Sequence, residues 1–273
     1  MRYDIEAIEN ALYTDGITAL PQAFSRGWVE RMREDIDAAY ADASARPNGA
    51  VGRGPNRYYV EIHPEQLRGF NDLATHPWVV AVCTQILGPA YEIVELGFDI
   101  PFAGAKDQPW HRDFPSPPDT HSGRKITSLA FNLTAVDTTA DMGPFEIAPG
   151  THFEAGLDWH HQMLPPKTEW PRFAALAQRK LPRMGDISVR SALTVHRGTA
   201  NHSQLARPVL VMGVDAPGAG HAALHDPMVT PAFWEKAPPI VKKHLVCRVV
   251  DELIPITQKH QIEGLVMGAD AMG

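Results

Sequence analysis

The residues most suited to chemistry in this sequence are His111 and Asp113, two positions apart in Pro109-Trp110-His111-Arg112-Asp113. On an extended backbone, residues i and i+2 point to the same side, so this imidazole and this carboxylate can bind one metal ion together. His196, which follows the run Leu193-Thr194-Val195, offers a second imidazole from far along the chain. Two nitrogens and one oxygen on one face of an octahedral metal leave three positions open, which is the arrangement of non-haem Fe(II) oxygenases. A His-x-Asp pair by itself also occurs as a surface ion pair, so its neighbours must decide between the two interpretations.

Arg207 follows His196 and comes directly before Pro208 and the apolar run 209–214. We expect His196 and Arg207 on neighbouring strands that face one cavity, where a guanidinium would pair with the carboxylate of a ligand through two parallel hydrogen bonds. The alternative is a surface arginine that precedes a strand.

The elements that must position these residues change in character along the chain. Helical spacing predicts helices over 3–12, 25–40 and 77–87, with a short strand at 17–20 and a loop rich in glycine and basic residues at 44–57. Short β runs then follow at 91–100, 125–136, 145–147, 186–189 and 208–214, separated by Gly-Pro and Pro-Gly turns. We expect a β-rich α+β fold, a sandwich or barrel core buttressed by helices at both ends.

One domain of 273 residues is expected, because no stretch resembles an interdomain linker. Its predicted parts are a helical N-terminal part (1–90), a β core (91–215) with a lid-like insertion at 155–180, and a helical C-terminal part (228–273), helical mainly over 231–253. The formal net charge of −7, without a block of like charges, argues against a nucleic-acid partner. The sequence contains no run of 18 apolar residues, so no membrane span is predicted. Its two cysteines, Cys83 and Cys247, lie far apart, which favours a reducing cytoplasm over a disulfide framework.

A resemblance to a known family becomes specific between the two ligand segments. The stretch Gly143-Pro144-Phe145-Glu146-Ile147-Ala148-Pro149-Gly150-Thr151-His152 resembles a characteristic turn of the phytanoyl-CoA dioxygenase family of 2-oxoglutarate-dependent oxygenases. The block from Gly185-Asp186 through His196-Arg197-Gly198 and Asn201 to Arg207-Pro208 resembles the family's distal-histidine region, and Asp15-Gly16-Ile17 its opening. The resemblance covers about residues 10–215 and implies a double-stranded β-helix, or jelly roll. Thr151 in place of the commoner serine and Arg190 in place of an acidic or neutral residue are departures from the family pattern.

The resemblance also implies roles. Fe(II) would be held by His111, Asp113 and His196, and Arg207 would hold the distal carboxylate of 2-oxoglutarate, which with O2 is converted to succinate and CO2 while a substrate is oxidised. Further candidates for cosubstrate contacts are Asn132, Thr194 and Gln108. Asn132 shares one face of its strand with Ser128, Ala130 and Thr134, and this face lies either in the barrel or in solvent.

Substrate contacts are predicted for Arg190, Tyr59, Arg57 and Trp110, although Trp110 is also a natural core residue. The substrate is expected to be a small molecule of secondary metabolism, anionic if Arg112, Arg190 and Arg197 face inward. The sequence leaves open whether the protein is a monomer or a homodimer.

Three other interpretations of the triad compete with this one. A halogenase of the same fold would need the coordination position that Asp113 fills, so the carboxylate favours hydroxylation, desaturation or a related C–H oxidation. A cupin-like metal-dependent isomerase or hydrolase would not need Arg207. A jelly-roll binding protein without catalysis would not need the intact triad together with the arginine.

Overall fold

The structure is a computed structural model that describes residues 3–115, 120–154, 159 and 162–257. Its framework is a seven-stranded sheet in the order β1-β8-β5-β10-β4-β3-β2, and the pairs within it are antiparallel. The strands are β1 (Ile17–Leu20), β2 (Val51–Gly52), β3 (Arg57–Glu61), β4 (Glu92–Pro101), β5 (Ser128–Thr134), β8 (Ile187–Ser191) and β10 (Val209–Asp215). A three-stranded antiparallel sheet, β7-β6-β9, comprises β7 (Gln178–Lys180), β6 (Phe145–Ile147) and β9 (His196–Gly198). Two antiparallel sheets around one interior are a jelly roll, as expected.

The N-terminal helices begin where their sequence provides a cap. The side chain of Asp4 accepts from the amide of Ala7 at the start of α1 (Ile5–Thr14), and Ser25 does the same for Trp28 at the start of α2 (Arg26–Ser44). Pro77 is the first residue of α4 (Pro77–Leu87), a position where its missing N–H costs nothing. The three helices lie within two residues of the predicted bounds, except that α2 continues to Ser44.

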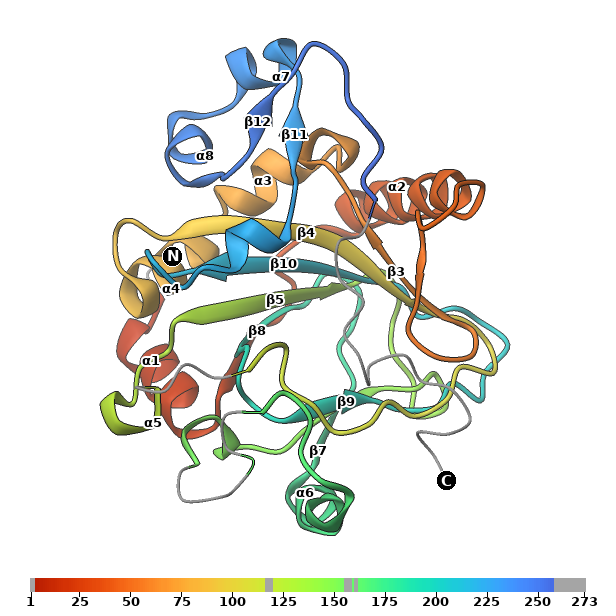
Figure 1. The fold of residues 1–273 in the computed structure, drawn as a ribbon, viewed down its shortest axis with the longest axis vertical. Helices are drawn as coiled ribbons and strands as arrows, with labels where there is room; N and C mark the ends of the chain where they lie inside the picture. Colours follow the sequence, from red (N-terminus) through yellow and green to blue (C-terminus); the bar gives the residue numbers. More distant parts are fainter. Residues whose placement is uncertain (1–2, 116–119, 155–158, 160–161, 258–273) are drawn as a thin grey trace.

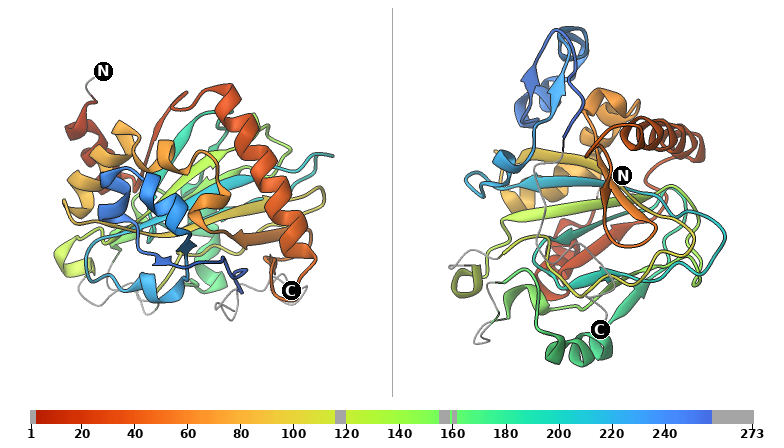
Figure 2. Two further views of the ribbon diagram at one scale, coloured as in Figure 1. Left: turned by 90° about the horizontal axis from the view of Figure 1, so that it is seen from above. Right: turned by 45° about the vertical axis from the view of Figure 1, so that its right-hand side comes forward.

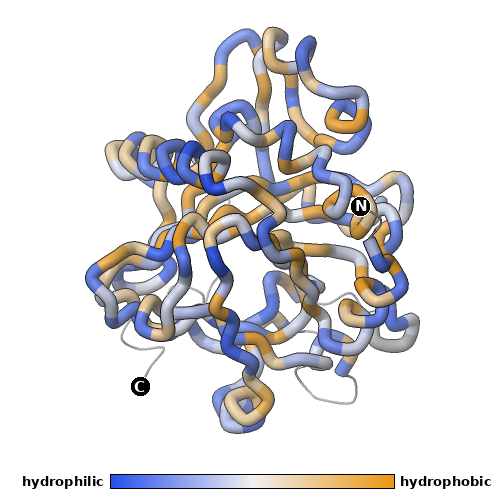
Figure 3. The backbone as a smooth tube through the Cα atoms, turned by 180° about the vertical axis from the view of Figure 1, so that it is seen from behind, coloured by the Kyte–Doolittle hydropathy of each residue, from blue (hydrophilic) through white to orange (hydrophobic). Residues whose placement is uncertain are grey.

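The helices cover one face of the large sheet. Along β5, Phe131 and Leu133 belong to the main hydrophobic cluster with residues of α1, α2 and α4, whereas Asn132 and Thr134 face the interior cavity. Figure 3 shows the hydrophobic residues gathered along the central strands and a mixed pattern along α2. Burying the apolar side of each strand against helices contributes about 25 cal/mol per Å² of apolar surface. The polar side of β5 therefore lies inside the barrel.

The strand predicted at 17–20 is present as β1, and the N-terminal part also contributes β2 and β3 at the opposite side of the large sheet. A short helix, α3 (Phe70–Ala74), precedes α4 and was not predicted. Other short elements are the single turns η1 (Pro64–Gln66), η2 (Thr151–Phe153), η3 (Lys167–Glu169) and η4 (His221–Leu224), and the helices α5 (Thr120–Gly123) and α6 (Trp170–Leu176). Figure 1 shows α6 at one end of the molecule beside β7; residues 155–158, 160 and 161 of the predicted insertion lie outside the described residues.

The C-terminal part also differs from the prediction of a mostly helical 231–253. Two six-residue helices, α7 (Pro231–Lys236) and α8 (Pro239–His244), are separated at Ala237-Pro238, and the parallel pair β11 (Met228–Val229) and β12 (Arg248–Val249) lies beside them. Figures 1 and 2 show this segment next to α3, at the opposite end of the molecule from α6. Proline interrupts the helical run because it lacks a donor and clashes with the preceding turn. Residues 258–273 lie outside the described residues. No described helix is long and apolar enough to cross a membrane.

Candidate metal centre

The two histidines of the proposed triad face each other across a backbone bridge. The amide of His111 donates to the carbonyl of His196 at 3.0 Å, and the amide of His196 donates back at 2.9 Å. Each Nδ1 lies 2.8 Å from a backbone carbonyl two residues earlier, that of Pro109 or of Thr194. This contact fixes the ring and leaves both Nε2 atoms available as ligands.

Asp113 completes the triad. Ligand atoms of His111, Asp113 and His196 all lie within 4.8 Å of one another, and they are the one such group of three found among the described residues. Burial together with His196 lowers the pKa of His111 well below its usual value, and burial together with Arg190 lowers that of His196. Burial by itself would raise the pKa of Asp113, but Arg190 and the two histidines bring it below its usual range. The site therefore offers neutral imidazoles and an ionised carboxylate, the forms that bind a metal.

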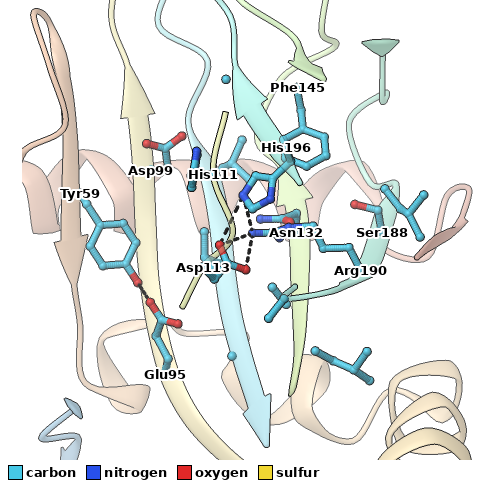
Figure 4. A pocket seen from close by; sticks show the side chains of 18 of the residues that line it. Tyr59, Glu95, Asp99, His111, Asp113, Asn132, Phe145, Ser188, Arg190 and His196 are labelled. Carbon is cyan, nitrogen blue, oxygen red and sulfur yellow. Dashed lines mark hydrogen bonds and ion pairs between the residues drawn. The ribbon is translucent and has the colours of Figure 1, made fainter. Parts of the chain in front are cut away.

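Arg190 holds the triad from the large sheet. One of its terminal nitrogens lies 2.8 Å from both oxygens of Asp113 and 3.2 Å from Nε2 of His196, and the other donates to Oδ1 of Asn132 at 2.6 Å. Figure 4 shows the side chains of Asp113, Arg190 and His196 converging on one point. A cation thus occupies the space beside the same ligand atoms that a metal would use.

The triad opens into a cavity of about 830 Å³ between the two sheets. Of the residues predicted for cosubstrate and substrate, Arg207, Asn132, Gln108, Arg190 and Tyr59 line it. Gln108 is tied to the strand of His196, since its side-chain oxygen accepts from the amide of Gly198 at 2.8 Å. Arg57 is buried directly behind Gly198. His196 and Arg207 share the cavity, but from different sheets, because β9 belongs to the small sheet and Arg207 precedes β10 of the large one.

Four other residues point away from the cavity: Thr194 and Trp110, which were predicted to contact ligands, and Arg112 and Arg197, which were considered for an anionic substrate. The hydroxyl of Thr194 is directed to the carbonyl of Gly16 at 3.3 Å, and Trp110 packs with Phe173 and Val195 in a second hydrophobic cluster. Arg112 reaches the carbonyl of Thr151, and Arg197 binds Glu146. Neither Thr194 nor Trp110 lines the cavity. Of the three arginines on which an anionic substrate depended, only Arg190 faces inward.

Several polar cavity residues were missed from the sequence, among them the carboxylates of Glu61, Glu95, Asp99 and Asp215. Glu95 accepts from the hydroxyl of Tyr59, a pair that Figure 4 shows apart from the triad, and Glu61 lies 3.1 Å from Nδ1 of His225. Asp215 lies 3.0 Å from Nδ1 of His221 and accepts from the hydroxyl of Ser128 at 2.6 Å. The alternation Glu95-x-Gly97-x-Asp99 was a signal for Glu95 and Asp99, whereas nothing local marked Glu61, His221 or His225.

Comparison with known proteins decides the family. The family model described as phytanoyl-CoA dioxygenase (PhyH) matches residues 12–209. The chain belongs to the PhyH family. It is therefore an Fe(II)- and 2-oxoglutarate-dependent oxygenase, and iron and 2-oxoglutarate are its cofactors. A search of curated protein sequences finds no match.

Solved structures support the PhyH fold. The carbocyclase SnoK from nogalamycin biosynthesis aligns with a TM-score of 0.63 at 18% identity, over 83% of this chain and 92% of its own. The epimerase SnoN, solved with Fe3+, alpha ketoglutarate and nogalamycin RO, gives 0.60 at 21% identity, over 79% and 91%. EctD from S. alaskensis, solved with 2-oxoglutarate and 5-hydroxyectoine, gives 0.62 at 17% identity, over 79% and 76%. At these identities the likeness is one of fold.

Proposed function

We propose that His111, Asp113 and His196 bind the iron of this PhyH-family oxygenase, and that the enzyme oxidises a C–H bond of a small organic substrate. The observation that carries the proposal is the geometry of the triad: three ligand atoms within 4.8 Å, with both Nδ1 atoms engaged by backbone carbonyls. Three ligands on one face of the metal leave room for a cosubstrate and O2.

The cavity also fits 2-oxoglutarate. Arg207 is buried at the cavity wall, and burial, followed by the charge of Arg57, lowers its pKa to about 10. The charge of Arg57 acts on Arg207, and Asp99 is the nearby carboxylate that opposes it. Two cations with one carboxylate leave an excess of positive charge away from water. Such an excess is costly unless a further anion joins it. The distal carboxylate of 2-oxoglutarate meets that requirement.

When bound, iron and 2-oxoglutarate would together activate O2, and 2-oxoglutarate would be converted to succinate and CO2. The chain's own residues hold and orient the reactants. Arg207 would bind the cosubstrate carboxylate, while Asn132 and Gln108 present amides to the same space. His111 and His196 are only 6% and 3% exposed, and burial strengthens the polar contacts around them. Asp113 would fill the coordination position that a halide takes in a halogenase, which favours hydroxylation, desaturation or a related oxidation.

The opposite end of the cavity suggests the kind of substrate. Glu61 and Asp215 are buried there, Glu95 and the imidazoles of His221 and His225 line the same wall, and the ring of Phe114 stacks on His221 at 3.7 Å. An acidic wall repels an anion and accepts hydrogen bonds. We therefore favour a substrate with hydroxyl or amine donors rather than an anionic one. The similarity in fold to SnoK and SnoN from nogalamycin biosynthesis supports a substrate of specialised metabolism.

The test is turnover. Purified protein with Fe(II), ascorbate and 2-oxoglutarate should consume O2 and form succinate slowly without substrate, and faster with a compound that fits the acidic end. His111→Ala and Asp113→Ala should lose both metal binding and succinate formation, because each removes a ligand atom. Protein that neither binds nor turns over 2-oxoglutarate with iron present would refute the proposal.

A further inference from the structure

The imidazole of His221 is held in one orientation by the carboxylate of Asp215. Its Nδ1 lies 3.1 Å and 3.0 Å from the two carboxylate oxygens, and the backbone amide of His221 donates to the same carboxylate at 3.1 Å. The hydroxyl of Ser128 donates to Asp215 as well, at 2.6 Å. Asp215 is 2% exposed, so these donors take the place of water around it. Three donors that converge on one buried carboxylate fix the ring of His221 against β10.

The carboxylate also decides which ring nitrogen of His221 carries the proton. An ionised carboxylate can only accept hydrogen bonds, so Nδ1 is the nitrogen that donates to it. In a neutral imidazole the other nitrogen, Nε2, is then an acceptor. Within the described part of the chain, no residue forms a hydrogen bond with Nε2 of His221. His221 lines the cavity, and it therefore offers a ligand one acceptor whose polarity is fixed by Asp215.

The ring of His221 also lies close to the metal centre. It stacks on the ring of Phe114, with the two centroids 3.7 Å apart and an angle of 17° between the planes. Phe114 directly follows Asp113, the proposed carboxylate ligand of the iron. A substrate group that binds to Nε2 of His221 is therefore held a short distance from the place where oxidation occurs.

We propose that His221 determines substrate specificity by accepting, through Nε2, a hydrogen bond from a hydroxyl group near the carbon that is oxidised. Asp215 is the positioning residue that keeps Nε2 an acceptor. This inference rests on the proposed function. An ammonium group would pair with one of the carboxylates of the wall, whereas a neutral hydroxyl needs a neutral acceptor such as this imidazole. The site therefore selects an alcohol or phenol over an analogue with a methyl group in place of the hydroxyl, because the analogue leaves Nε2 without a donor.

The competing explanation is that His221 only anchors the turn η4 to β10. The two explanations are separated by His221→Asn. The amide of asparagine can still donate to Asp215 from about the place of Nδ1, but the shorter side chain has no atom at the place of Nε2. A structural anchor is largely kept by this change, whereas an acceptor for the substrate is lost.

The experiment compares two probes, 2-naphthol and 2-methylnaphthalene, which share their rings and differ in a hydroxyl against a methyl group of similar size. Their fluorescence reports binding to protein loaded with Ni(II) and 2-oxoglutarate, at about pH 8, above the range in which imidazole ordinarily takes up a proton. His221→Asn should weaken 2-naphthol about tenfold relative to 2-methylnaphthalene, the loss of one hydrogen bond to a cavity acceptor. A purely structural role would lower the melting temperature and leave the ratio of the two affinities unchanged.

Asp215→Asn tests the same idea without changing the ring, and it decides the question should His221→Asn fail to fold. An amide can donate as well as accept, so it no longer fixes the proton on Nδ1, and the preference for 2-naphthol should fall although His221 is present. His202→Asn is the control, since His202 is exposed after β9 and does not line the cavity; its ratio should be that of the wild type.

Two results would overturn the role of His221: an unchanged ratio of affinities in His221→Asn, or wild-type protein that does not bind 2-naphthol. Failure of the wild-type protein to bind 2-oxoglutarate with metal would instead overturn the proposed function, so the two failures are distinguishable.

Discussion

Arg190 is expected to compete with the metal, and Arg190→Gln should therefore bind a divalent ion more tightly. A bound ion lies about 2 Å from its ligand atoms. A nitrogen of Arg190 lies 2.8 Å from Asp113 oxygens and 3.2 Å from Nε2 of His196, so it would be no more than about 5 Å from that ion. At an effective dielectric constant of about 20, the repulsion between charges of +1 and +2 at that distance is about 7 kcal/mol.

The measurable effect is smaller than this repulsion, because Arg190 can move away when the metal enters. What must then be given up is its charge-assisted pairing with Asp113, which contributes about 1.5–3 kcal/mol. We therefore expect Arg190→Gln to bind Ni(II) about ten- to a hundredfold more tightly. The metal-free variant should also unfold at a lower temperature than the wild type, since Asp113 loses its partner, and saturating metal should narrow that difference.

The assay is competition for Ni(II) with a chromophoric chelator at one fixed pH, together with thermal unfolding with and without metal. Arg179→Gln is the control. It removes the same charge, but Arg179 pairs with Glu146 on the small sheet and does not contact the triad. Unchanged or weaker Ni(II) binding by Arg190→Gln would show that Arg190 serves chiefly to orient Asp113, and the reasoning from repulsion would be wrong.

Three further predictions follow from other parts of the structure. Arg207→Ala should weaken 2-oxoglutarate binding by about one to two decades in calorimetry, through the loss of a charge-assisted pair, and unchanged affinity would remove Arg207 from the site. Burial alone would lower the pKa of His225, but its hydrogen bond to Glu61 and the nearby carboxylates raise that pKa above its usual value. The His225–Glu61 pair should therefore stabilise the fold fully below about pH 6.5, and this stabilisation should be lost as the pH rises through the raised pKa. Urea unfolding should thus show a difference between wild type and His225→Gln that shrinks with rising pH, and a difference independent of pH would contradict this assignment. Gly143→Ala should lower the melting temperature more than Gly218→Ala, because both glycines have positive φ, +71° and +82°, but only at Gly143 would a Cβ overlap a backbone carbonyl; equal losses would argue against the overlap.

His111 and Asp113, two of the three proposed metal ligands, could be predicted from a local relation, whereas His196 lies far along the chain and its role was implied by the family resemblance. Alternation along an extended strand places His111 and Asp113 on one side, and the same rule places Asn132 with Thr134 on the cavity face. Applied strictly, the rule also excludes Trp110, which precedes His111 and so points away. It excludes Arg112 and Arg197 for the same reason, and with them the argument for an anionic substrate.

Other features depend on contacts that no local pattern records. Thr194 lies two residues before His196, but residues 192–194 form a turn, so alternation does not apply there. Glu61 reaches the cavity through the register of β3 against β4, and His225 through a loop that follows β10. Such long-range pairings are set by the packing of the whole sheet, and a single sequence does not reveal them.

The two proposed histidine ligands and the acidic end of the cavity are held by different parts of the fold. The paired histidines are held by main-chain hydrogen bonds on the small-sheet side, whereas Tyr59, Glu95 and Asp215 project from the large sheet. Substitutions at the proposed substrate wall therefore leave untouched the main-chain hydrogen bonds that hold His111 and His196. Substitutions on β3, β4 and β10 can therefore change which substrate binds during evolution, while the geometry of the triad is kept. For protein engineering, the same separation makes those three strands the place to randomise.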